Sequence, residues 1–473
     1  MALSRLSLPS SVSDRVAFAL PTSVWVSVFT AFFFVVLRRR LGWCPALGAT
    51  GLLFFHPRWF AHSHMAEYDI QIAMVWWAAA VSFHWANSTR LPKRTIWSRS
   101  AVAAFFFALA LSVKIHAFFL PFPFLFWVLL FQRWQAWRWA LLSAFMGPLL
   151  YLASQPYLWW NTAERLGKRL LDYGEKLPIN VFYFGEVYPG NLPWHYAWVL
   201  LGVTLPVGFL VLFVLGMLRF ISSATEDLSR WIRGERDTLQ QKDVEEESVS
   251  GSVAPVVRGP ERGGDRLEWM VFLLLNAVAT PILFTWKSPY DGIRLFLAAL
   301  PFLAMIGAEG IGLLEERLRL RFGEVARRAV PAAAVLLVGC QAFTCYQLHP
   351  FQLAHYSALV GGVRGAHHLG LETTYWADAI TPGFVAEMAD RLPEDANLWL
   401  HALDPEPLLE YQRQGTAPQG WRFNEEGLIH AHLVHFRQGF FGPGQWQLVS
   451  SERPWLLQEA IHDVPLVRVY RGP

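Results

Sequence analysis

The sequence has little charge for its length. Only 16% of its 473 residues are Asp, Glu, Lys or Arg, whereas 54% are hydrophobic and 23 are tryptophan. A soluble protein of this size needs more polar surface than that. The composition therefore excludes a soluble globular protein and indicates a membrane protein. The net charge of +3 is too small to indicate nucleic acid as a partner.

The sequence also has few cysteines. All three, Cys44, Cys340 and Cys345, lie in or beside apolar segments. This placement favours packed free thiols over a disulfide framework or a zinc site. The histidines of "HAHLVHF" have no matching carboxylate or cysteine pattern, so a strand is favoured over a metal site there. No metal ligand or cofactor is assigned, and a requirement for a divalent metal stays open.

About ten apolar stretches are candidates for membrane spans, each of which needs roughly 20 apolar residues, or fewer with snorkelling side chains at its ends. They are residues 16–37, 42–55, 69–87, 101–114, 116–131, 138–155, 195–219, 269–286, 293–314 and 329–346. Lys and Arg gather in one set of alternate loops, which the positive-inside rule places in the cytoplasm. One of these loops, 220–267, is polar and rich in Gly, Ser and Pro, which predicts a flexible linker.

The chain divides into two predicted parts. Residues 1–346 form the transmembrane part, and residues 347–473 lose the long apolar runs. The second part alternates helix-like "GFVAEMADRL" with strand-like "NLWLHAL" and "PLVRVYR", which predicts a small soluble α/β domain. The loop-charge pattern places this domain outside the cytoplasm. The predicted fold class is an α-helical polytopic membrane protein with a small C-terminal extracytoplasmic α/β domain.

Ionisable side chains crowd the outer start of the third span, in "HPRWFAHSHMAEYDI". Glu67 and Asp69 form a Glu-x-Asp pair there, and Arg58, His62 and His64 precede them. Carboxylates in this position can bind a cation or a hydroxyl group. The alternative is structural, because a helix dipole favours acidic groups at its N-terminus and membrane interfaces are rich in aromatic residues.

Cations lie on the outer side, where the positive-inside rule leaves few of them. Lys114 ends an apolar span, and the turn "WKSPYDGIR" holds four further candidates, Lys287, Tyr290, Asp291 and Arg294. These cations either snorkel and pair with acidic neighbours or hold an anion, most simply the phosphate of a lipid-linked substrate. We predict that Glu67, Asp69 and the lysine and arginine side chains converge around one cavity at the outer membrane boundary.

Six runs in this sequence resemble those of bacterial membrane glycosyltransferases related to the protein O-mannosyltransferases and the lipid A aminoarabinose transferases. The runs are "HPRWFAHSHMAEYDI", "LALSVKIHAFFLP", "QPYLWWNTAERLGKRLLDY", "NLPWHYAWVLLGVTLP", "SPYDGIRLFLAALPFLAMIGAEGIG" and "LHPFQLAHYSALVGGVRGAHHLGLETTYWAD". The resemblance covers most of the chain and implies the membrane bundle of C-type glycosyltransferases. It also implies a multi-pass protein of the bacterial inner membrane.

The activity implied by the resemblance is transfer of a sugar from a polyprenyl-phosphate donor to an acceptor hydroxyl on a lipid, glycan or protein, with inversion. In that chemistry a carboxylate, here Glu67 or Asp69, takes the acceptor proton. Lys114, Lys287, Arg294 and Arg58 are the candidates for the donor phosphate, since cations stabilise the charge on a departing phosphate. The amphipathic stretch "TAERLGKRLLDYGEKL" predicts a helix over the donor groove or one that merely packs on the bundle.

Two other classes stay open, a lipid or solute transporter and a catalytically degenerate membrane scaffold. A transporter is expected to carry charge near the bilayer midplane, whereas the charges here gather at the outer rim. In the family that the sequence resembles, a first helix leads to an outer loop with an Asp-Glu motif that carries the presumed base. The sequence has neither, so we expect a chain that is N-terminally truncated or has little activity.

Overall fold

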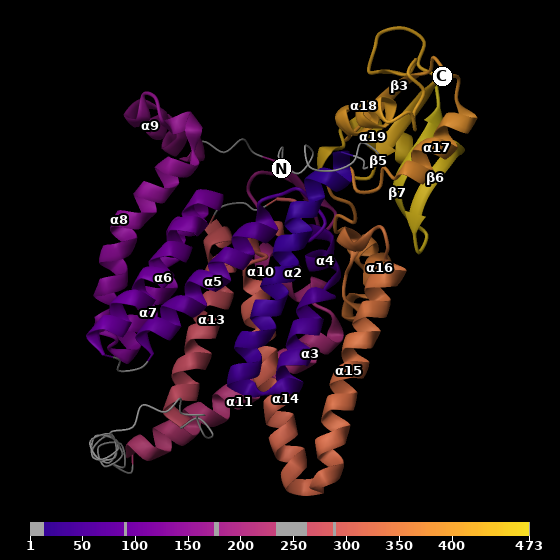
Figure 1. The fold of residues 1–473 in the computed structure, drawn as a ribbon. Helices are drawn as coiled ribbons and strands as arrows, with labels where there is room; N and C mark the ends of the chain where they lie inside the picture. Colours follow the sequence, from indigo (N-terminus) through magenta and orange to yellow (C-terminus); the bar gives the residue numbers. More distant parts are fainter. Residues whose placement is uncertain (1–13, 89–91, 175–178, 233–262, 287–289, 473) are drawn as a thin grey trace.

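The computed structural model describes residues 14–88, 92–174, 179–232, 263–286 and 290–472. A bundle of helices makes up most of the molecule, and a small mixed sheet lies at one end of it (Figure 1). The helices of the bundle are α2 (Asp14–Leu41), α3 (Trp43–Phe54), α4 (Pro57–His62), α5 (Asp69–Asn87), α6 (Lys93–Val113), α7 (Pro121–Phe131), α8 (Trp137–Ser154), α9 (Thr162–Gly174), α10 (Tyr196–Thr204), α11 (Val207–Ile232), α13 (Gly263–Trp286), α14 (Ala299–Phe322) and α15 (Glu324–Gln347).

Five helices in the described part of the chain are long and apolar enough to cross a membrane. These segments are Val16–Leu41, Arg94–Val113, Val207–Glu226, Arg266–Thr285 and Arg328–Gln347, and two shorter apolar helical segments are Trp43–Phe54 and Ile115–Phe131. The expected number of ten spans is not confirmed. The single span expected at 195–219 is wrong, because α10 ends at Thr204 and α11 begins at Val207. Pro206 lies between them, and because proline lacks an N–H it removes one helical hydrogen bond, which favours a break there.

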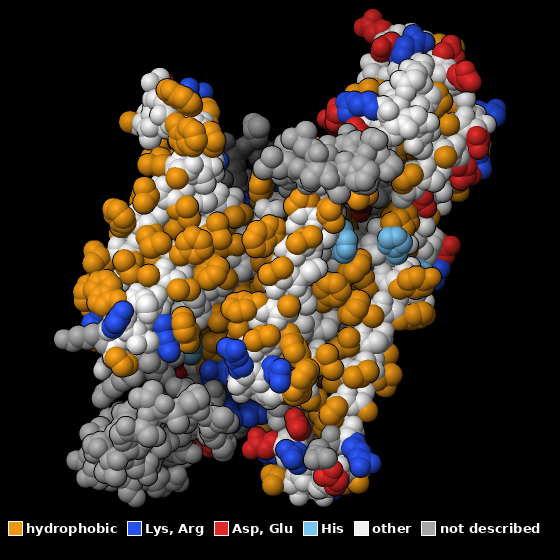
Figure 2. All heavy atoms as spheres, in the orientation of Figure 1, with side chains coloured by type: hydrophobic (Ala, Val, Ile, Leu, Met, Phe, Trp, Pro, Cys, Tyr) orange, Lys and Arg blue, Asp and Glu red, His pale blue; other side chains and the backbone are white. Residues whose placement is uncertain are grey.

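The loops predicted to share one side of a membrane lie at one end of the bundle. The C-terminal region, α4 and α9 lie at this end, whereas the tip of the α14–α15 hairpin lies at the other end with the close of α11 and the start of α13 (Figure 1). On the face drawn in Figure 2, apolar side chains cover the middle of the bundle and charged ones gather toward its two ends. Part of the linker expected at 220–267 is helical, since α11 continues to Ile232 and α13 starts at Gly263. The linker residues between these helices lie outside the described residues.

The bundle core is aromatic. Phe83 stacks on Phe124 with ring centroids 4.1 Å apart, and Phe124 also packs against Phe272 at 5.8 Å. Such rings bury large apolar areas in defined geometries. Helices α11 and α14 approach closely at small residues, where a Cβ added to Gly310 would lie 2.4 Å from the carbonyl oxygen of Leu212. The scaffold that carries the polar residues is therefore tightly packed.

The C-terminal region contains a five-stranded sheet with strand order β4-β3-β5-β7-β6. Strand β3 pairs in parallel with β4 and β5, and β7 pairs antiparallel with β5 and β6. The strands are β3 (Asn397–His401), β4 (Arg422–Phe423), β5 (Ala431–His435), β6 (Trp455–Ile461) and β7 (Val464–Arg471), and the helices are α16 (Gly362–His368), α17 (Pro382–Arg391), α18 (Glu406–Arg413) and α19 (Pro443–Ser450). The strands predicted from "NLWLHAL" and "PLVRVYR" and the helix predicted from "GFVAEMADRL" are all present.

Backbone hydrogen bonds join this region to the bundle. The N–H of Ser357 donates to the carbonyl of Val203 at 2.7 Å, and the N–H of Gly185 donates to Gly370 at 3.0 Å. Gly185 lies in the turn of a hairpin formed by β1 (Asn180–Tyr183) and β2 (Glu186–Pro189). The C-terminal region is thereby fixed over the end of the bundle that holds Glu67 and Asp69.

Candidate functional site

The two carboxylates of the predicted site lie in and after the connection between α4 and α5. Helix α4 begins at Pro57, a position where the missing N–H of proline costs no hydrogen bond. Asp69 is the first residue of α5, where the helix dipole favours a carboxylate. Glu67 precedes it by two residues, so both side chains are held at the same end of the bundle.

The Asp69 carboxylate contacts two cations. Its Oδ1 accepts a hydrogen bond from Nζ of Lys114, and its Oδ2 lies 4.0 Å from Nε of Arg294. Lys114 lies at the break between α6 and the 3-10 helix Ile115–Phe119, and Arg294 opens the 3-10 helix Arg294–Phe296. The Asp69 side chain is only 7% exposed, and a buried carboxylate needs such partners. Three residues far apart in the sequence therefore meet.

The turn before the second of these 3-10 helices orients Arg294. Its Nη1 lies 3.3 Å from Oδ2 of Asp291, and its guanidinium carbon lies 4.6 Å from the ring centre of Tyr290 and 5.0 Å from that of Trp376. Asp291 and Gly292 have φ values of 56° and 69°, in the left-handed region that is costly for residues other than glycine. The ring contacts and the ion pair restrict the guanidinium to one place.

Arg58 lies beneath this turn and not among the charges around Asp69. It is 1% exposed, its Nε donates to the carbonyl of His355 at 3.1 Å, and its guanidinium carbon lies 4.7 Å and 5.1 Å from the ring centres of Tyr356 and Tyr375. A Cβ on Gly292 would lie 2.7 Å from its Nη1. This burial contradicts the expectation that Arg58 binds a donor phosphate, because the side chain supports the turn from inside.

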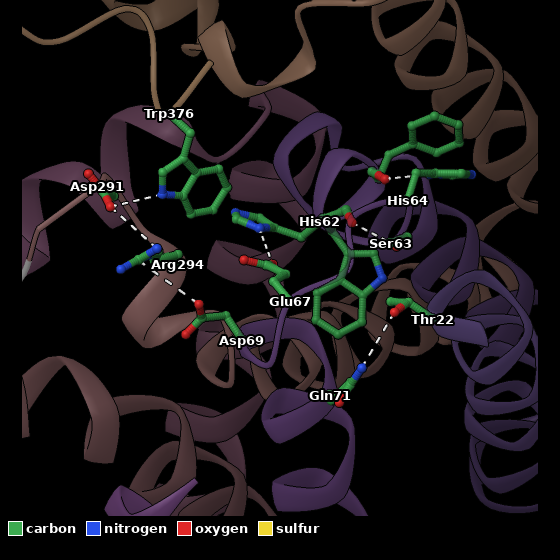
Figure 3. A network of polar contacts seen from close by, with 12 residues as sticks. Thr22, His62, Ser63, His64, Glu67, Asp69, Gln71, Asp291, Arg294 and Trp376 are labelled. Carbon is green, nitrogen blue, oxygen red and sulfur yellow. Dashed lines mark hydrogen bonds and ion pairs between the residues drawn. The ribbon is translucent and has the colours of Figure 1, made fainter. Parts of the chain in front are cut away.

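Glu67 carries a carboxylate oxygen that accepts no hydrogen bond among the described residues. Its Oε1 is hydrogen-bonded to Nδ1 of His62, and the two side chains are 14% and 3% exposed. Its Oε2 has no hydrogen-bond partner in the described part of the chain. The His62 ring meets the Trp376 ring edge-on, with centroids 5.7 Å apart. In Figure 3 the Glu67 carboxylate points toward the side on which Arg294 and Asp69 lie.

Two further predicted residues are not part of this cluster. The Nδ1 atom of His64 lies 2.7 Å from the carbonyl oxygen of Phe60, its side chain is exposed, and it lies across the view from Arg294 in Figure 3. Lys287 lies outside the described residues. Within the ranges that the structure describes, no group of three or more His, Cys, Asp or Glu side chains could hold a metal ion.

A largely apolar cavity of about 860 Å³ leads away from Lys114. Its walls come from α6, α7, α8 and α13, and Leu166 of α9 also contributes. A second apolar cavity of about 470 Å³ shares five lining residues with it, which are Phe107, Phe118, Pro121, Trp139 and Ala140. The two cavities therefore adjoin each other, and we call them together the apolar groove. We call Glu67, Asp69, Lys114, Asp291 and Arg294 the charged cluster. Lys114 and Tyr290 line the groove and also contact Asp69 and Arg294 of this cluster, respectively.

The C-terminal region adds two residues that the sequence did not single out. The indole nitrogen of Trp376 donates to Oδ2 of Asp291 at 3.1 Å, and Nη2 of Arg437 lies 2.5 Å from Oδ1 of the same carboxylate. Trp376 also lies in the run "TYWAD", which is part of the family resemblance. The arrangement combines paired cations, a carboxylate oxygen without a partner and an apolar groove, which together can hold a lipid phosphate and accept a proton.

A buried carboxyl group lies behind Arg437. Burial raises the pKa of Glu372 to about 7, although the nearby charge of Arg437 and the N–H of Gly439 act in the opposite direction. The Oε1 atom accepts a hydrogen bond from that N–H at 3.1 Å. The folded state therefore holds a proton that the unfolded chain releases above a pH of about 4.5. This contribution to stability is complete at low pH and is lost as the pH rises to about 7.

Replacing Glu372 by Gln should remove this pH dependence, because an amide does not ionise and can still accept the hydrogen bond. The raised pKa corresponds to roughly 3 kcal/mol at a pH above 7, so the variant should melt at a higher temperature than the wild type at pH 8. At pH 5 the two should differ much less. Melting curves of the detergent-purified protein test this expectation, with the exposed Glu394→Gln as a control. Parallel pH profiles for Glu372→Gln and the wild type would contradict it.

The chain was compared with known proteins. No protein-family model and no curated protein matches it. Two solved structures are similar over 96% of this chain, both of ArnT from Cupriavidus metallidurans. The apo structure matches with a TM-score of 0.49 over 83% of its own chain, and the structure bound to undecaprenyl phosphate matches with 0.47 over 84%. Sequence identity is 11% in both cases.

Proposed function

We propose that this chain is an integral membrane glycosyltransferase that moves a sugar from a polyprenyl phosphate to an acceptor hydroxyl. The observation that carries the proposal is the position of Lys114, which lines the apolar groove and also binds the Asp69 carboxylate. A polyprenyl phosphate likewise joins a long apolar chain to an anionic head group. A site for it must place a cation where an apolar groove ends.

The groove supports the assignment of the lipid chain. Its walls are mainly Phe, Leu, Trp, Ala and Pro side chains, and burial of an apolar chain against such walls contributes about 0.8 kcal/mol for each CH₂ group. Leu166 brings the amphipathic helix α9 to the groove, which supports a place for this helix over the proposed donor site. Helix α9 then serves as part of the wall at the membrane surface.

The charged cluster supports the assignment of the chemistry. In a single displacement the acceptor oxygen forms a bond to the anomeric carbon while the bond from that carbon to the phosphate oxygen breaks, which inverts the configuration. The proton of the acceptor hydroxyl passes to Oε2 of Glu67, and His62 holds the other oxygen of this carboxylate. Lys114 and Arg294 receive the negative charge of the departing polyprenyl phosphate.

Asp69 has a different role in this scheme from the one that the sequence suggested. Both of its oxygens face cations, Lys114 and Arg294, so neither is turned toward an acceptor hydroxyl. Asp69 therefore orients the two cations, and Glu67 is the proposed general base. The roles of Tyr290 and Asp291 are to position Arg294, through the ring contact and the ion pair.

We further propose that residues 1–346 form the membrane domain and residues 347–473 an extracytoplasmic domain, in the inner membrane of a bacterium. The charged cluster would then lie at the outer membrane boundary, where a lipid-linked donor presents its head group. The acceptor would be a lipid, glycan or protein that carries a hydroxyl group on that side. Cysteine accessibility at the tip of the α14–α15 hairpin and in the C-terminal region of intact cells tests this orientation.

A transfer assay tests the activity itself. Purified wild-type protein in detergent is incubated with polyprenyl phosphates that carry radiolabelled sugars, together with a cell-envelope extract as the acceptor source. The proposal predicts label in an acceptor fraction and an equal amount of released polyprenyl phosphate. If the wild type releases no polyprenyl phosphate from any of the sugar donors, the proposed activity is wrong.

Blocking the groove should weaken donor binding. Ala140 lines both of its cavities, so the indole of Ala140→Trp would displace part of the polyprenyl chain. Loss of two buried CH₂ groups corresponds to about tenfold in affinity. Leu141→Trp is the matched control, because Leu141 is adjacent in sequence but 56% exposed and lines neither cavity. Equal affinities of the two variants for undecaprenyl phosphate would show that the chain does not occupy the groove.

One observation favours a transporter as the second candidate. Nε of Arg219 in α11 lies 3.4 Å from Oε2 of Glu309 in α14, and Glu309 is fully buried. Charged pairs inside a membrane bundle often lie on transport pathways. The same guanidinium lies near Glu316 at 3.4 Å, next to a close glycine contact of the two helices, so the pair also fastens α11 to α14. Solute uptake by proteoliposomes, without transfer in the radiolabel assay, would support the transporter.

A further inference from the structure

The C-terminal region holds both oxygens of a single carboxylate in the charged cluster. Oδ1 of Asp291 lies 2.5 Å from Nη2 of Arg437, and Oδ2 accepts a hydrogen bond from the indole of Trp376 at 3.1 Å. Oδ2 also lies 3.3 Å from Nη1 of Arg294. A continuous series of contacts therefore runs from Arg437 through Asp291 to Arg294 and then to Asp69.

These contacts are buried and well supported. The Arg437 and Asp291 side chains are 14% and 7% exposed, and the Arg437 guanidinium carbon lies 4.5 Å from the ring centre of Phe440. Loss of one partner from a buried ion pair leaves the other charge unpaired, which is costly. Arg437 lies two residues after the end of β5, and its N–H donates to the carbonyl of His435 at 2.7 Å, so the sheet of the C-terminal region restrains its backbone.

The turn that carries Asp291 needs such support. Asp291 has a φ of 56°, a conformation that persists in residues other than glycine only when surrounding contacts hold it. Arg437 and Trp376 supply contacts to both carboxylate oxygens from outside the bundle. Without Arg437 the Asp291 carboxylate can turn away, and Arg294 loses the partner that holds its Nη1 atom.

We propose that Arg437 is a positioning residue that sets the place of Arg294 through Asp291, so that the C-terminal region forms part of the transfer machinery. The inference rests on the proposed function and deepens it. Arg437 itself does not touch the donor in this scheme. Replacing Arg437 should therefore change the recognition of the donor phosphate and kcat/KM for the donor. The KM for the acceptor should stay unchanged.

The test uses the full-length protein and the variant Arg437→Gln, with Arg468→Gln as the matched control. Arg468 lies on β7 and stacks on Trp455 at 4.2 Å, and it contacts Gln458 within the same sheet. It therefore controls for loss of a partly buried arginine in the C-terminal region. Arg437→Lys, which keeps the charge, is the second variant in case the glutamine variant fails to fold.

The first readout is the preference for undecaprenyl phosphate over undecaprenol, measured by the shift in melting temperature as each lipid is added. We expect Arg437→Gln to reduce this preference about tenfold or more and to lower kcat/KM for the donor by about 10- to 100-fold, because small displacements of a binding group have effects of this size. Arg468→Gln should keep the wild-type phosphate preference and the wild-type kcat/KM for the donor. The values for Arg437→Lys should lie between those of the wild type and those of Arg437→Gln.

The second readout is a double-mutant cycle with Asp291→Asn. If Arg437 acts through Asp291, Arg437→Gln should add little to the effect of Asp291→Asn, since residues that act as a unit are not additive. Fully additive effects would overturn the inference and point to direct donor contact. The inference would also be wrong if a folded Arg437→Gln variant kept the wild-type phosphate preference. The same holds for Arg437→Lys where the glutamine variant does not fold. A wild type that shows no phosphate preference would overturn the proposed function, and this inference with it.

Discussion

Replacement of Glu67 by Gln is expected to lower the rate of sugar transfer by about 10²- to 10⁴-fold, the usual contribution of a general base. The amide keeps the size of the side chain and can still bond to His62, but it cannot take the acceptor proton. Affinity for undecaprenyl phosphate should stay near the wild-type value, since the phosphate is assigned to Lys114 and Arg294. Single-turnover transfer of radiolabelled sugar and lipid-dependent melting shifts measure the two quantities separately.

The controls for this variant come from the same segment. Glu67→Asp should retain part of the activity, because it keeps a carboxylate but shortens its reach. His64→Ala should have no effect, since His64 is exposed and bonds only to the Phe60 carbonyl in the described structure. Asp69→Asn should chiefly weaken donor binding, because Lys114 and Arg294 lose their shared partner. Wild-type transfer by Glu67→Gln, with loss of transfer but not of binding in Asp69→Asn, would make Asp69 the base.

Replacement of Arg294 by Ala is expected to weaken binding of undecaprenyl phosphate by about 10- to 100-fold, as hydrogen bonds to charged groups contribute roughly 1.5–3 kcal/mol. Binding of undecaprenol, which lacks the phosphate, should change little. Lys114→Ala should behave in the same way, because both cations face Asp69. Titrations of the two lipids against the purified variants give the phosphate contribution by difference.

Arg391→Ala is the control, because it removes one positive charge, as Arg294→Ala does. Arg391 pairs with Glu387 on the exposed face of α17, so its loss should leave both lipid affinities unchanged. An Arg294→Ala variant that loses affinity for undecaprenol and undecaprenyl phosphate equally would contradict the assignment. The cation would then support the shape of the groove and not the recognition of the phosphate.

Much of the arrangement follows from patterns that lie within a short stretch of sequence. The loss of apolar runs after residue 346 and the alternation in "PLVRVYR" predict the change from bundle to sheet, and β7 occupies that stretch. The amphipathic pattern around Leu166 predicts α9. The outer cations were expected to meet Asp69 because buried charges need partners, and Lys114 and Arg294 do so.

Other features depend on contacts that no local pattern records. The pairing of Asp291 with Arg437 joins residues 146 positions apart, and neither periodicity nor charge balance predicts it. Arg58 resembles a site residue in sequence, but two tyrosine rings enclose it in the interior. The apolar run continues through Pro206 and so predicts a single span, and a proline does not by itself identify a break, because α2, α8, α13 and α15 each continue through one.

The most direct test of the central claim is a structure of this protein with undecaprenyl phosphate bound. We expect the phosphate next to Lys114 and Arg294, within reach of Glu67, and the polyprenyl chain in the apolar groove between α6, α7, α8 and α13. A phosphate bound elsewhere, or a polyprenyl chain outside the groove, would contradict the proposed site.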